Sequence, residues 1–147
     1  MSMVDVIIVD LDGTLCNIEH RLHLLKQEGD HWSKFFSAMP GDSLNVWCRE
    51  LIENMKNNYG ILLVSGRPDN FKKATEEWLA KHKVSYDALY MRTAGDRRPD
   101  NVVKKDLYES YIKDNMKVLF VVDDRKAVVD MWRELGLTVL HCAVGDY

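Results

Sequence analysis

Acidic residues gather at two places in the sequence, each directly after a short apolar run. Asp10 and Asp12 follow one such run near the N-terminus, and Asp123 and Asp124 follow another near the C-terminus. If both runs are parallel strands of one sheet, the four carboxylates meet at one edge of that sheet. Burying such a self-repelling cluster is costly unless a cation neutralises it. Because neither His nor Cys stands beside these oxygen ligands, Mg²⁺ is the expected ion.

A second set of residues adds positive charge and room for close backbone approach. Ser65, Gly66 and Arg67 follow another apolar run, and Lys104 lies in the segment before the last acidic pair. Protein-bound Mg²⁺ that retains waters typically meets a substrate phosphate. Lys104 and Arg67 would neutralise the phosphate oxygens, and Gly13 and Gly66 would let the backbone approach them. The pattern therefore predicts magnesium-dependent chemistry on a phosphate ester.

Each motif taken alone has an ordinary structural explanation. An Asp-x-Asp at a strand end is often a turn or a cap, and a Ser-Gly-Arg tripeptide fits a strand-to-helix turn. The Asp-Asp pair could cap the helix that follows it, and Arg97 and Arg98 could belong to a solvated loop. The occurrence of these motifs in this order, at strand ends, favours one shared site.

Short apolar runs alternate with helical patterns along the chain. Five runs predict strands buried on both faces: Val6–Val9, Ile61–Val64, Ala88–Met91, Val118–Val122 and Thr138–His141. Four stretches have apolar residues at helical spacing: Leu44–Met55, Phe71–Leu79, Val102–Tyr111 and Ala127–Leu135. Ser43 is the expected N-cap of the first helix, and Gly136 ends the last. The alternation predicts an α/β fold, with a five-stranded parallel sheet and helices on both faces.

The segment His20–Met39 does not fit this alternation. Its apolar residues suggest one or two short helices between the first strand and the first long helix: Leu22, Leu24, Leu25, Trp32, Phe35 and Phe36. We expect this insertion to lie above the sheet as a small cap. Residues 1–147 are then expected to form a single domain with a small helical insertion over about residues 20–40.

Composition narrows the function classes. Aliphatic and aromatic residues make up 46% of the 147 residues and charged residues 29%, as in soluble proteins. The formal net charge of -3 does not predict nucleic-acid binding by global charge, although a local basic patch is compatible with it. No apolar run approaches the roughly 20 residues needed to span a membrane, and no signal peptide is expected. Three scattered cysteines indicate neither a zinc site nor a disulfide framework, so a reducing cytoplasm is the expected location.

The motifs resemble those of the haloacid-dehalogenase-like (HAD) phosphatases. The segment Asp10–Leu15 is similar to the first motif of that superfamily, Ser65 to the second, Lys104 to the third and Asp123-Asp124 to the fourth. The four motifs stand in family order across nearly the whole chain. The resemblance implies a Rossmann-like HAD fold and a Mg²⁺-dependent phosphatase.

The resemblance also implies a role for each matching residue. Asp10 would attack phosphorus and become an aspartyl phosphate, and Asp12 would protonate the leaving oxygen and then deprotonate the hydrolytic water. An Asp at position 12 favours phosphatases over dehalogenases. The metal site would comprise Asp10, Asp12 through its backbone carbonyl, and Asp123 or Asp124. The phosphate would be bound by Thr14, Ser65, Gly66 and Lys104.

A closer resemblance is to the 3′-phosphatase domains of the T4-type phage polynucleotide kinase-phosphatases. It rests mainly on five segments: Val64–Arg67, Gly95–Lys104, Asp123–Arg125, Val129–Arg133 and Gly145–Tyr147. Arg21, Arg67, Asp100 and Lys104 match functional positions of those domains. Pro99, Asn101 and the segment Leu22–Pro40 depart from the pattern, which bears on substrate contacts more than on the chemistry.

The resemblance leaves three hypotheses about function. The first is removal of a 3′-phosphate, or of a 2′,3′-cyclic phosphate, from DNA or RNA ends during nucleic acid repair. Arg21, Arg67, Arg97 and Arg98 would supply a local positive field for such ends. The second is a phosphatase of free nucleotides or other small phosphoesters, and the third is a non-catalytic module that binds nucleic-acid ends. The sequence contains no Gly-x-x-x-x-Gly-Lys-Ser/Thr loop, so it supports no 5′-kinase activity. A phage-encoded protein in the host cytoplasm is compatible with the sequence, and an oligomer interface cannot be located in it.

Overall fold

A five-stranded sheet forms the centre of the computed structural model, which describes residues 3–145 and 147. The order of its strands is β5-β4-β1-β6-β7, and every neighbouring pair is parallel. Their bounds are β1 Val4–Val9, β4 Gly60–Pro68, β5 Ala88–Arg92, β6 Met116–Arg125 and β7 Val139–Gly145. The predicted five-stranded parallel sheet is confirmed. Asp146, part of one segment that carries the resemblance, lies outside the described residues.

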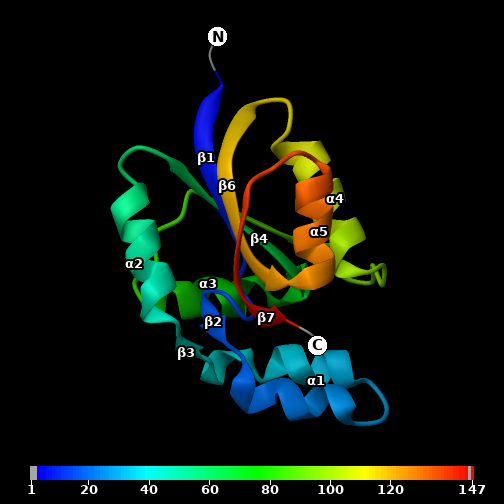
Figure 1. Ribbon diagram of the computed structural model, residues 1–147. Helices are drawn as coiled ribbons and strands as arrows, with labels where there is room; N and C mark the ends of the chain where they lie inside the picture. The colour runs from blue at the N-terminus through cyan, green and yellow to red at the C-terminus, as the bar shows by residue number, and fades with distance from the viewer. Residues whose placement is uncertain (1–2, 146) are drawn as a thin grey trace.

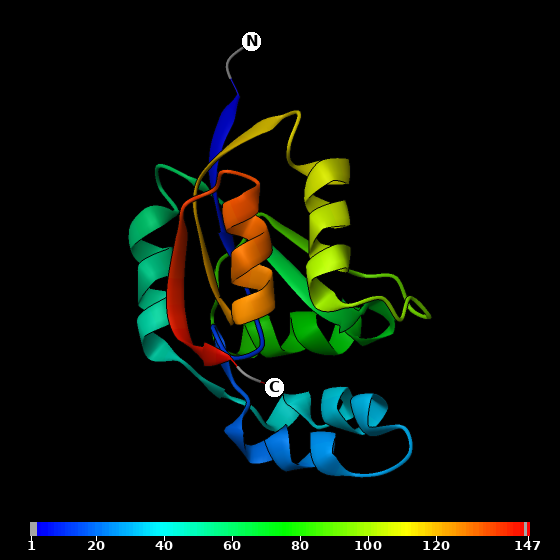
Figure 2. The same cartoon turned by 45° about the vertical axis from the view of Figure 1, so that its right-hand side comes forward.

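Helices cover both faces of the sheet, as predicted (Figures 1 and 2). On one face, α2 (Val46–Met55) and α3 (Lys72–Lys81) pack against the side chains of Ile7 and Val9. On the other, α4 (Asp100–Tyr111) and α5 (Lys126–Glu134) pack against Val6 and Ile8. Successive side chains of β1 point to opposite faces, so an unbroken apolar run serves both layers. No helix in the described part of the chain has both the length and the apolar character needed to cross a membrane.

The outer strand β7 departs from the prediction that all five strands are buried on both faces. Leu140 and Val144 in this strand are 45% and 88% exposed. Among the described strands β7 has only β6 as a neighbour, and it forms one edge of the sheet. The apolar run at its position therefore indicates a strand, and its burial depends on tertiary neighbours that the run does not report.

The predicted cap lies between the two short strands β2 (Cys16–Asn17) and β3 (Ser43–Leu44), which pair antiparallel. It consists of the 3₁₀ helix η1 (Glu19–Lys26), the helix α1 (His31–Ser37) and the 3₁₀ turn η2 (Met39–Gly41). Figures 1 and 2 place it beyond the carboxyl ends of the sheet strands. The prediction that Ser43 caps α2 is wrong. Ser43 belongs to β3, and the residue before α2 is Asn45, whose side chain donates to the carbonyl of Thr14 instead.

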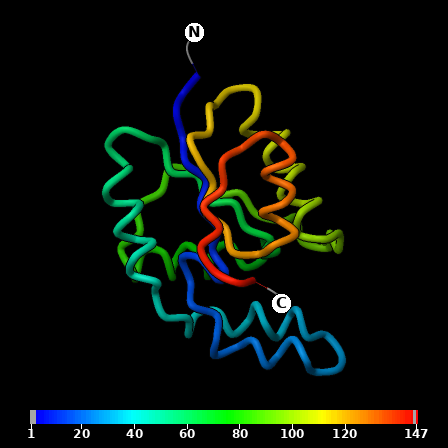
Figure 3. Tube along the Cα trace, viewed as in Figure 1, coloured from blue at the N-terminus to red at the C-terminus, as the bar shows by residue number. Residues whose placement is uncertain are grey.

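The order of the strands sets where a ligand can bind. After β1 the chain continues through β4 and the turn η3 (Asp69–Phe71) to β5 on one side, and then crosses to β6 and β7 on the other. Figure 3 lets the reader follow this crossing from green to amber around the blue strand. In open α/β sheets, ligands bind at such a switch point, outside the carboxyl ends of the strands. Here that point is the end of β1, beneath the cap.

Candidate active site

Asp10 lies one residue past the end of β1. Its backbone N–H donates to the carbonyl of Val122 at 3.0 Å, which extends the contact with β6. The Thr14 hydroxyl donates to Asp10 Oδ2 at 3.0 Å, and Lys104 Nζ donates to Asp10 Oδ1 at 2.8 Å. The side chain is thus held at both oxygens and is only 5% exposed. Such a carboxylate is pre-oriented, as a nucleophile must be.

Gly13 explains the turn that follows. Its φ of 83° lies in the left-handed region that glycine readily adopts. A Cβ at this position would lie 2.0 Å from Asp124 Oδ2, which is far inside van der Waals contact. The turn can therefore press against the end of β6 only if residue 13 has no side chain.

Irregular strand pairing accompanies the motifs on both neighbouring strands. The register shifts between Ser65 and Pro68 where β4 pairs with β5, and between Asp123 and Arg125 where β6 pairs with β7. Both motifs are part of their strands, since β4 and β6 continue through them. Irregularities of this kind re-aim side chains next to functional sites. The alternative in which Asp123 or Asp124 caps α5 is excluded, because the residue before α5 is Arg125.

We call Asp10, Asp123, Asp124 and Lys104 the acidic cluster. Oxygens of its three carboxylates all lie within 4.8 Å of one another. Lys104 Nζ bridges Asp10 and Asp123, at 2.8 and 3.0 Å. The Trp132 indole N–H donates to Asp123 Oδ2 at 3.3 Å, so this core side chain also orients a site residue. All four members of the cluster are buried.

The charges of the acidic cluster do not balance. Burial raises the pKa of Asp10, the neighbouring Asp123 raises it further, and Lys104 opposes them. Burial also raises the pKa of Asp124, whose Oδ1 is buried without a hydrogen-bond partner among the described residues. Three carboxylates face a single ammonium, an excess of two negative charges that one divalent cation would neutralise. Hard oxygen donors and an unpartnered carboxylate oxygen fit Mg²⁺.

A second group, which we call the arginine cluster, comprises Asp12, Asp42, Arg21 and Arg67. Arg21 donates to both oxygens of Asp42, at 2.8 and 2.7 Å, and also to Asp12. Arg67 donates from Nη2 to Asp12 Oδ1 at 2.6 Å and from Nε to both Asp12 oxygens. Arg67 Nη2 also lies 3.6 Å from Asp42 Oδ2. The two guanidinium charges therefore balance the two carboxylate charges, and His20 Nε2 also lies 2.6 Å from Asp42 Oδ1.

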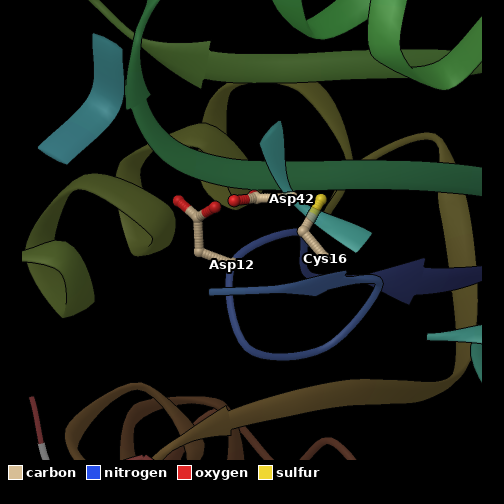
Figure 4. A group of neighbouring side chains, drawn as sticks. All are labelled: Asp12, Cys16 and Asp42. Carbon is tan, nitrogen blue, oxygen red and sulfur yellow. The ribbon is translucent and has the colours of Figure 1, made fainter. Parts of the chain in front are cut away.

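Figure 4 shows the Asp12 and Asp42 carboxylates side by side, with the thiol of Cys16 beside Asp42. This trio is no second metal site, because the two arginines already occupy the carboxylate oxygens. Burial raises the pKa of the Cys16 thiol, so it stays protonated. Burial would likewise raise the pKa of Asp12, but Arg67 and Arg21 overcome this and hold it well below its usual range. Asp12 is therefore an anion in this arrangement.

Asp100 forms the rim of the site on the α4 side. It receives hydrogen bonds from Arg92 at 2.7 Å and from Arg125 at 3.1 Å. Asp100 is the first residue of α4, where a negative charge interacts favourably with the helix dipole. A Cβ at Gly66 would lie 2.1 Å from Asp100 Oδ1, so the close approach of β4 to α4 requires glycine here.

One pocket collects most of the residues that the sequence predicted. Seven of them line it: Asp10, Asp12, Gly66, Asp100, Lys104, Asp123 and Asp124. The other four lie behind its wall and are 0 to 1% exposed: Thr14, Arg21, Ser65 and Arg67. The Ser65 hydroxyl accepts the N–H of Arg67 at 3.1 Å.

The expected positive field is smaller than predicted. Arg21 and Arg67 are buried in ion pairs, so they add no free charge to the surface. Arg98 forms salt bridges with Asp96 and Asp106 on the surface. Arg21 and Arg67 were expected to contribute to this field, and the structure instead pairs each of them with a buried carboxylate.

Sequence reasoning missed several residues that hold the site together. Asp42 anchors Arg21, and Arg92 donates to the carbonyl of Gly66 at 2.7 Å as well as to Asp100. The Tyr147 hydroxyl donates to the backbone carbonyl of Asp12 at 2.9 Å. Asp42 carries no local signal, since it follows a Pro-Gly turn and looks like an ordinary loop acid. Only its position opposite a buried arginine reveals it.

Comparison with known proteins agrees with this geometry. The family described as the polynucleotide kinase PNKP phosphatase domain matches residues 4–147. A protein of Autographa californica nuclear polyhedrosis virus, named as a bifunctional polynucleotide kinase/RNA ligase, is 26% identical over 144 residues. That match covers 96% of this chain and 20% of the viral protein, so the chain spans about a fifth of that relative.

Solved structures give the same result. A chain in the structure of the Pnkp1/Rnl/Hen1 RNA repair complex is 35% identical, with a TM-score of 0.87 over 99% of this chain and 44% of that one. A HAD-superfamily hydrolase from Geobacter sulfurreducens is 10% identical, with a TM-score of 0.62 over 92% of this chain and 85% of its own, and shows the shared fold. The chain is a HAD-type phosphatase, and it belongs to the family of polynucleotide kinase PNKP phosphatase domains.

Proposed function

We propose that this protein is a Mg²⁺-dependent phosphomonoesterase that removes 3′-phosphates from DNA or RNA ends through an aspartyl-phosphate intermediate. The observation that carries the proposal is the acidic cluster. It presents an oriented carboxylate, an ammonium and an unbalanced negative charge to one pocket. Binding alone requires no such nucleophile.

In the first step, a carboxylate oxygen of Asp10 attacks phosphorus. The new bond joins that oxygen to phosphorus, and the bond between phosphorus and the sugar oxygen breaks. The leaving sugar oxygen takes a proton from Asp12. In the second step, a water attacks phosphorus of the aspartyl phosphate and gives its proton to Asp12. Inorganic phosphate leaves, and the Asp10 carboxylate is regenerated.

The remaining residues of the acidic cluster stabilise charge. Burial lowers the pKa of Lys104, but Asp10 and Asp123 overcome this and raise it, so the side chain stays an ammonium that can pair with phosphate oxygens. Asp10, Asp123 and Asp124 would hold the metal, together with the backbone carbonyl of Asp12. When bound, Mg²⁺ supplies the charge that lets a phosphate dianion approach a carboxylate.

Asp12 must change partners to act as an acid. While it is paired with Arg21 and Arg67, its pKa is well below the usual range, so it holds no proton near neutral pH. That state suits the second step, in which Asp12 accepts a proton. Asp12 is already one of the residues that line the pocket. To donate a proton in the first step, its carboxyl group must break its hydrogen bonds with the two guanidiniums and turn toward the bound ester. We infer that this exchange of partners belongs to the catalytic cycle.

A phosphate-release panel with Mg²⁺ tests the proposed function. The substrates are 3′-phospho-DNA, 3′-phospho-RNA, 2′,3′-cyclic ends and free 3′-nucleotides, each with and without EDTA. We expect release from polynucleotide ends that EDTA abolishes. The RNA-repair names of the relatives favour RNA over DNA in this panel. Preference for free nucleotides would support the small-molecule hypothesis instead, and end binding without release from any substrate would support the binding module.

A further inference from the structure

We propose that Trp32 and Phe36 of the cap form a stacking platform for the base of the terminal nucleotide. The inference rests on the proposed function and deepens it, because it assigns a nucleobase subsite next to the phosphate site. We call these two side chains the aromatic wall. Both line the same pocket as the acidic cluster. A ligand whose phosphate reaches Asp10 therefore lies against this wall.

The aromatic wall has the geometry and exposure of a stacking surface. The ring centroids of Trp32 and Phe36 are 5.9 Å apart and their planes differ by 24°, an offset-stacked pair. Trp32 remains 41% exposed although it also contacts the rings of His31 and Phe35. A large aromatic ring that lines the pocket and stays accessible to solvent is well suited to bind the face of another ring.

Arg21 connects the aromatic wall to Asp12. Phe35, which precedes Phe36 on α1, is 1% exposed, and the Arg21 guanidinium lies 4.2 Å above its ring centroid. Arg21 also donates to the Phe35 carbonyl at 3.2 Å and pairs with Asp12. The distance from the wall to the phosphate site is therefore fixed by the same arginine that holds Asp12. Phe36 also contacts Phe71, at 5.8 Å between ring centroids.

The chemistry of the pocket favours a nucleobase over other occupants. The pocket is also lined by Asp100 and Arg125, which pair with each other at 3.1 Å, so an extended apolar chain would have to cover a charged pair. In a nucleoside 3′-phosphate, one sugar separates the flat base from the phosphate. The pocket has a matching arrangement, because the aromatic wall lies beside the proposed phosphate site. Every base has a π-face, so stacking of this kind tolerates all four bases. We therefore expect little preference for the terminal base.

The test compares two 3′-phosphorylated oligonucleotides that differ only in the terminal residue, one with a base and one abasic. For the wild type we expect kcat/KM to fall roughly 10- to 100-fold on the abasic end, as the loss of one stacked base implies. Trp32→Ala should lose a similar factor on the base-bearing end and little on the abasic end. Trp47→Ala is the matched control: Trp47 is 48% exposed but lies on α2, and it does not line the pocket.

The outcomes separate the two proposals. If the wild type releases phosphate equally fast from both ends, the stacking proposal is wrong and the proposed function stands. If it releases no phosphate from either end, both are overturned. If Trp32→Ala lowers release from the two ends by the same factor, its role is structural, and stacking on Trp32 is overturned. Should the circular dichroism spectrum show that Trp32→Ala is unfolded, Trp32→Leu, which keeps an apolar contact without the aromatic face, replaces it in the same comparison.

Discussion

The acidic cluster and the arginine cluster lie on adjacent parts of one site but differ in their state of charge. In the acidic cluster three carboxylates share one ammonium, and no residue that the structure describes forms a hydrogen bond with Asp124 Oδ1. In the arginine cluster two carboxylates meet two guanidiniums through several short hydrogen bonds. The first is electrostatically incomplete, and the second is complete within the protein.

This difference indicates a division of labour. An incomplete buried cluster is costly by itself and becomes favourable when a cation and a phosphate bind. A complete cluster gains nothing from a ligand, so its value lies in holding side chains and the cap in position. Asp12 belongs to the complete cluster yet lines the pocket, and it therefore connects the two.

The largest expected effect concerns the nucleophile. Asp10→Asn should lower turnover on every phosphate ester by about 10⁴-fold or more, because the covalent step has no substitute in the site. It should not unfold the protein, since it reduces an excess of negative charge. Rapid acid quench of the wild type should place labelled phosphate on Asp10. A label on Asp12 or Ser65 would overturn the covalent scheme.

The residue that connects the clusters should show an effect that depends on the leaving group. Asp12→Asn should lower turnover of a sugar 3′-phosphate roughly 10²- to 10⁴-fold, as loss of a general acid does. The loss on p-nitrophenyl phosphate should be much smaller, because that leaving group needs little protonation. Comparable losses on both esters would mean that Asp12 acts only by holding Arg21 and Arg67.

The arginine cluster should respond in stability and not in metal dependence. Asp42→Asn leaves the buried Arg21 with one anionic partner fewer, and breaking a buried pair in this way typically costs about 3–5 kcal/mol. Denaturant unfolding should show this loss equally with Mg²⁺ and with EDTA. Asp130→Asn is the control, since it removes an exposed pair with Lys126 and should hardly change stability. A loss for Asp42→Asn that appears only with Mg²⁺ would place Asp42 in the metal site.

Sequence alone predicted the acidic cluster far better than the arginine cluster. Asp10, Asp123 and Asp124 stand at strand ends, and parallel strands bring their carboxyl ends together, so periodicity was enough to join these three. Lys104 lies in the first half of α4, and its place in the site was implied by the resemblance to the HAD phosphatases. Arg21 and Arg67 were predicted as phosphate contacts, but their ion pairs with Asp12 and Asp42 cross between the cap and the sheet. No local pattern encodes such pairs. The cap itself was predicted as an irregular insertion. The sequence does not show that Trp32 and Phe36 face the acidic cluster, because that depends on how the cap packs on the sheet.

The smallest expected effect tests the incomplete cluster directly. Mg²⁺ at a hundredfold its dissociation constant should stabilise the wild type by about 2.7 kcal/mol, because the ion binds only the folded state. Asp124→Asn should abolish most of this gain, since it removes a proposed ligand. In EDTA the same variant should be as stable as the wild type or more stable, because burial and Asp123 oppose the charge on Asp124. Thermal unfolding with and without Mg²⁺ measures both effects. A variant that is less stable in EDTA yet keeps the full response to Mg²⁺ would show that Asp124 is a structural acid, like Asp42, and that the division between the clusters is drawn in the wrong place.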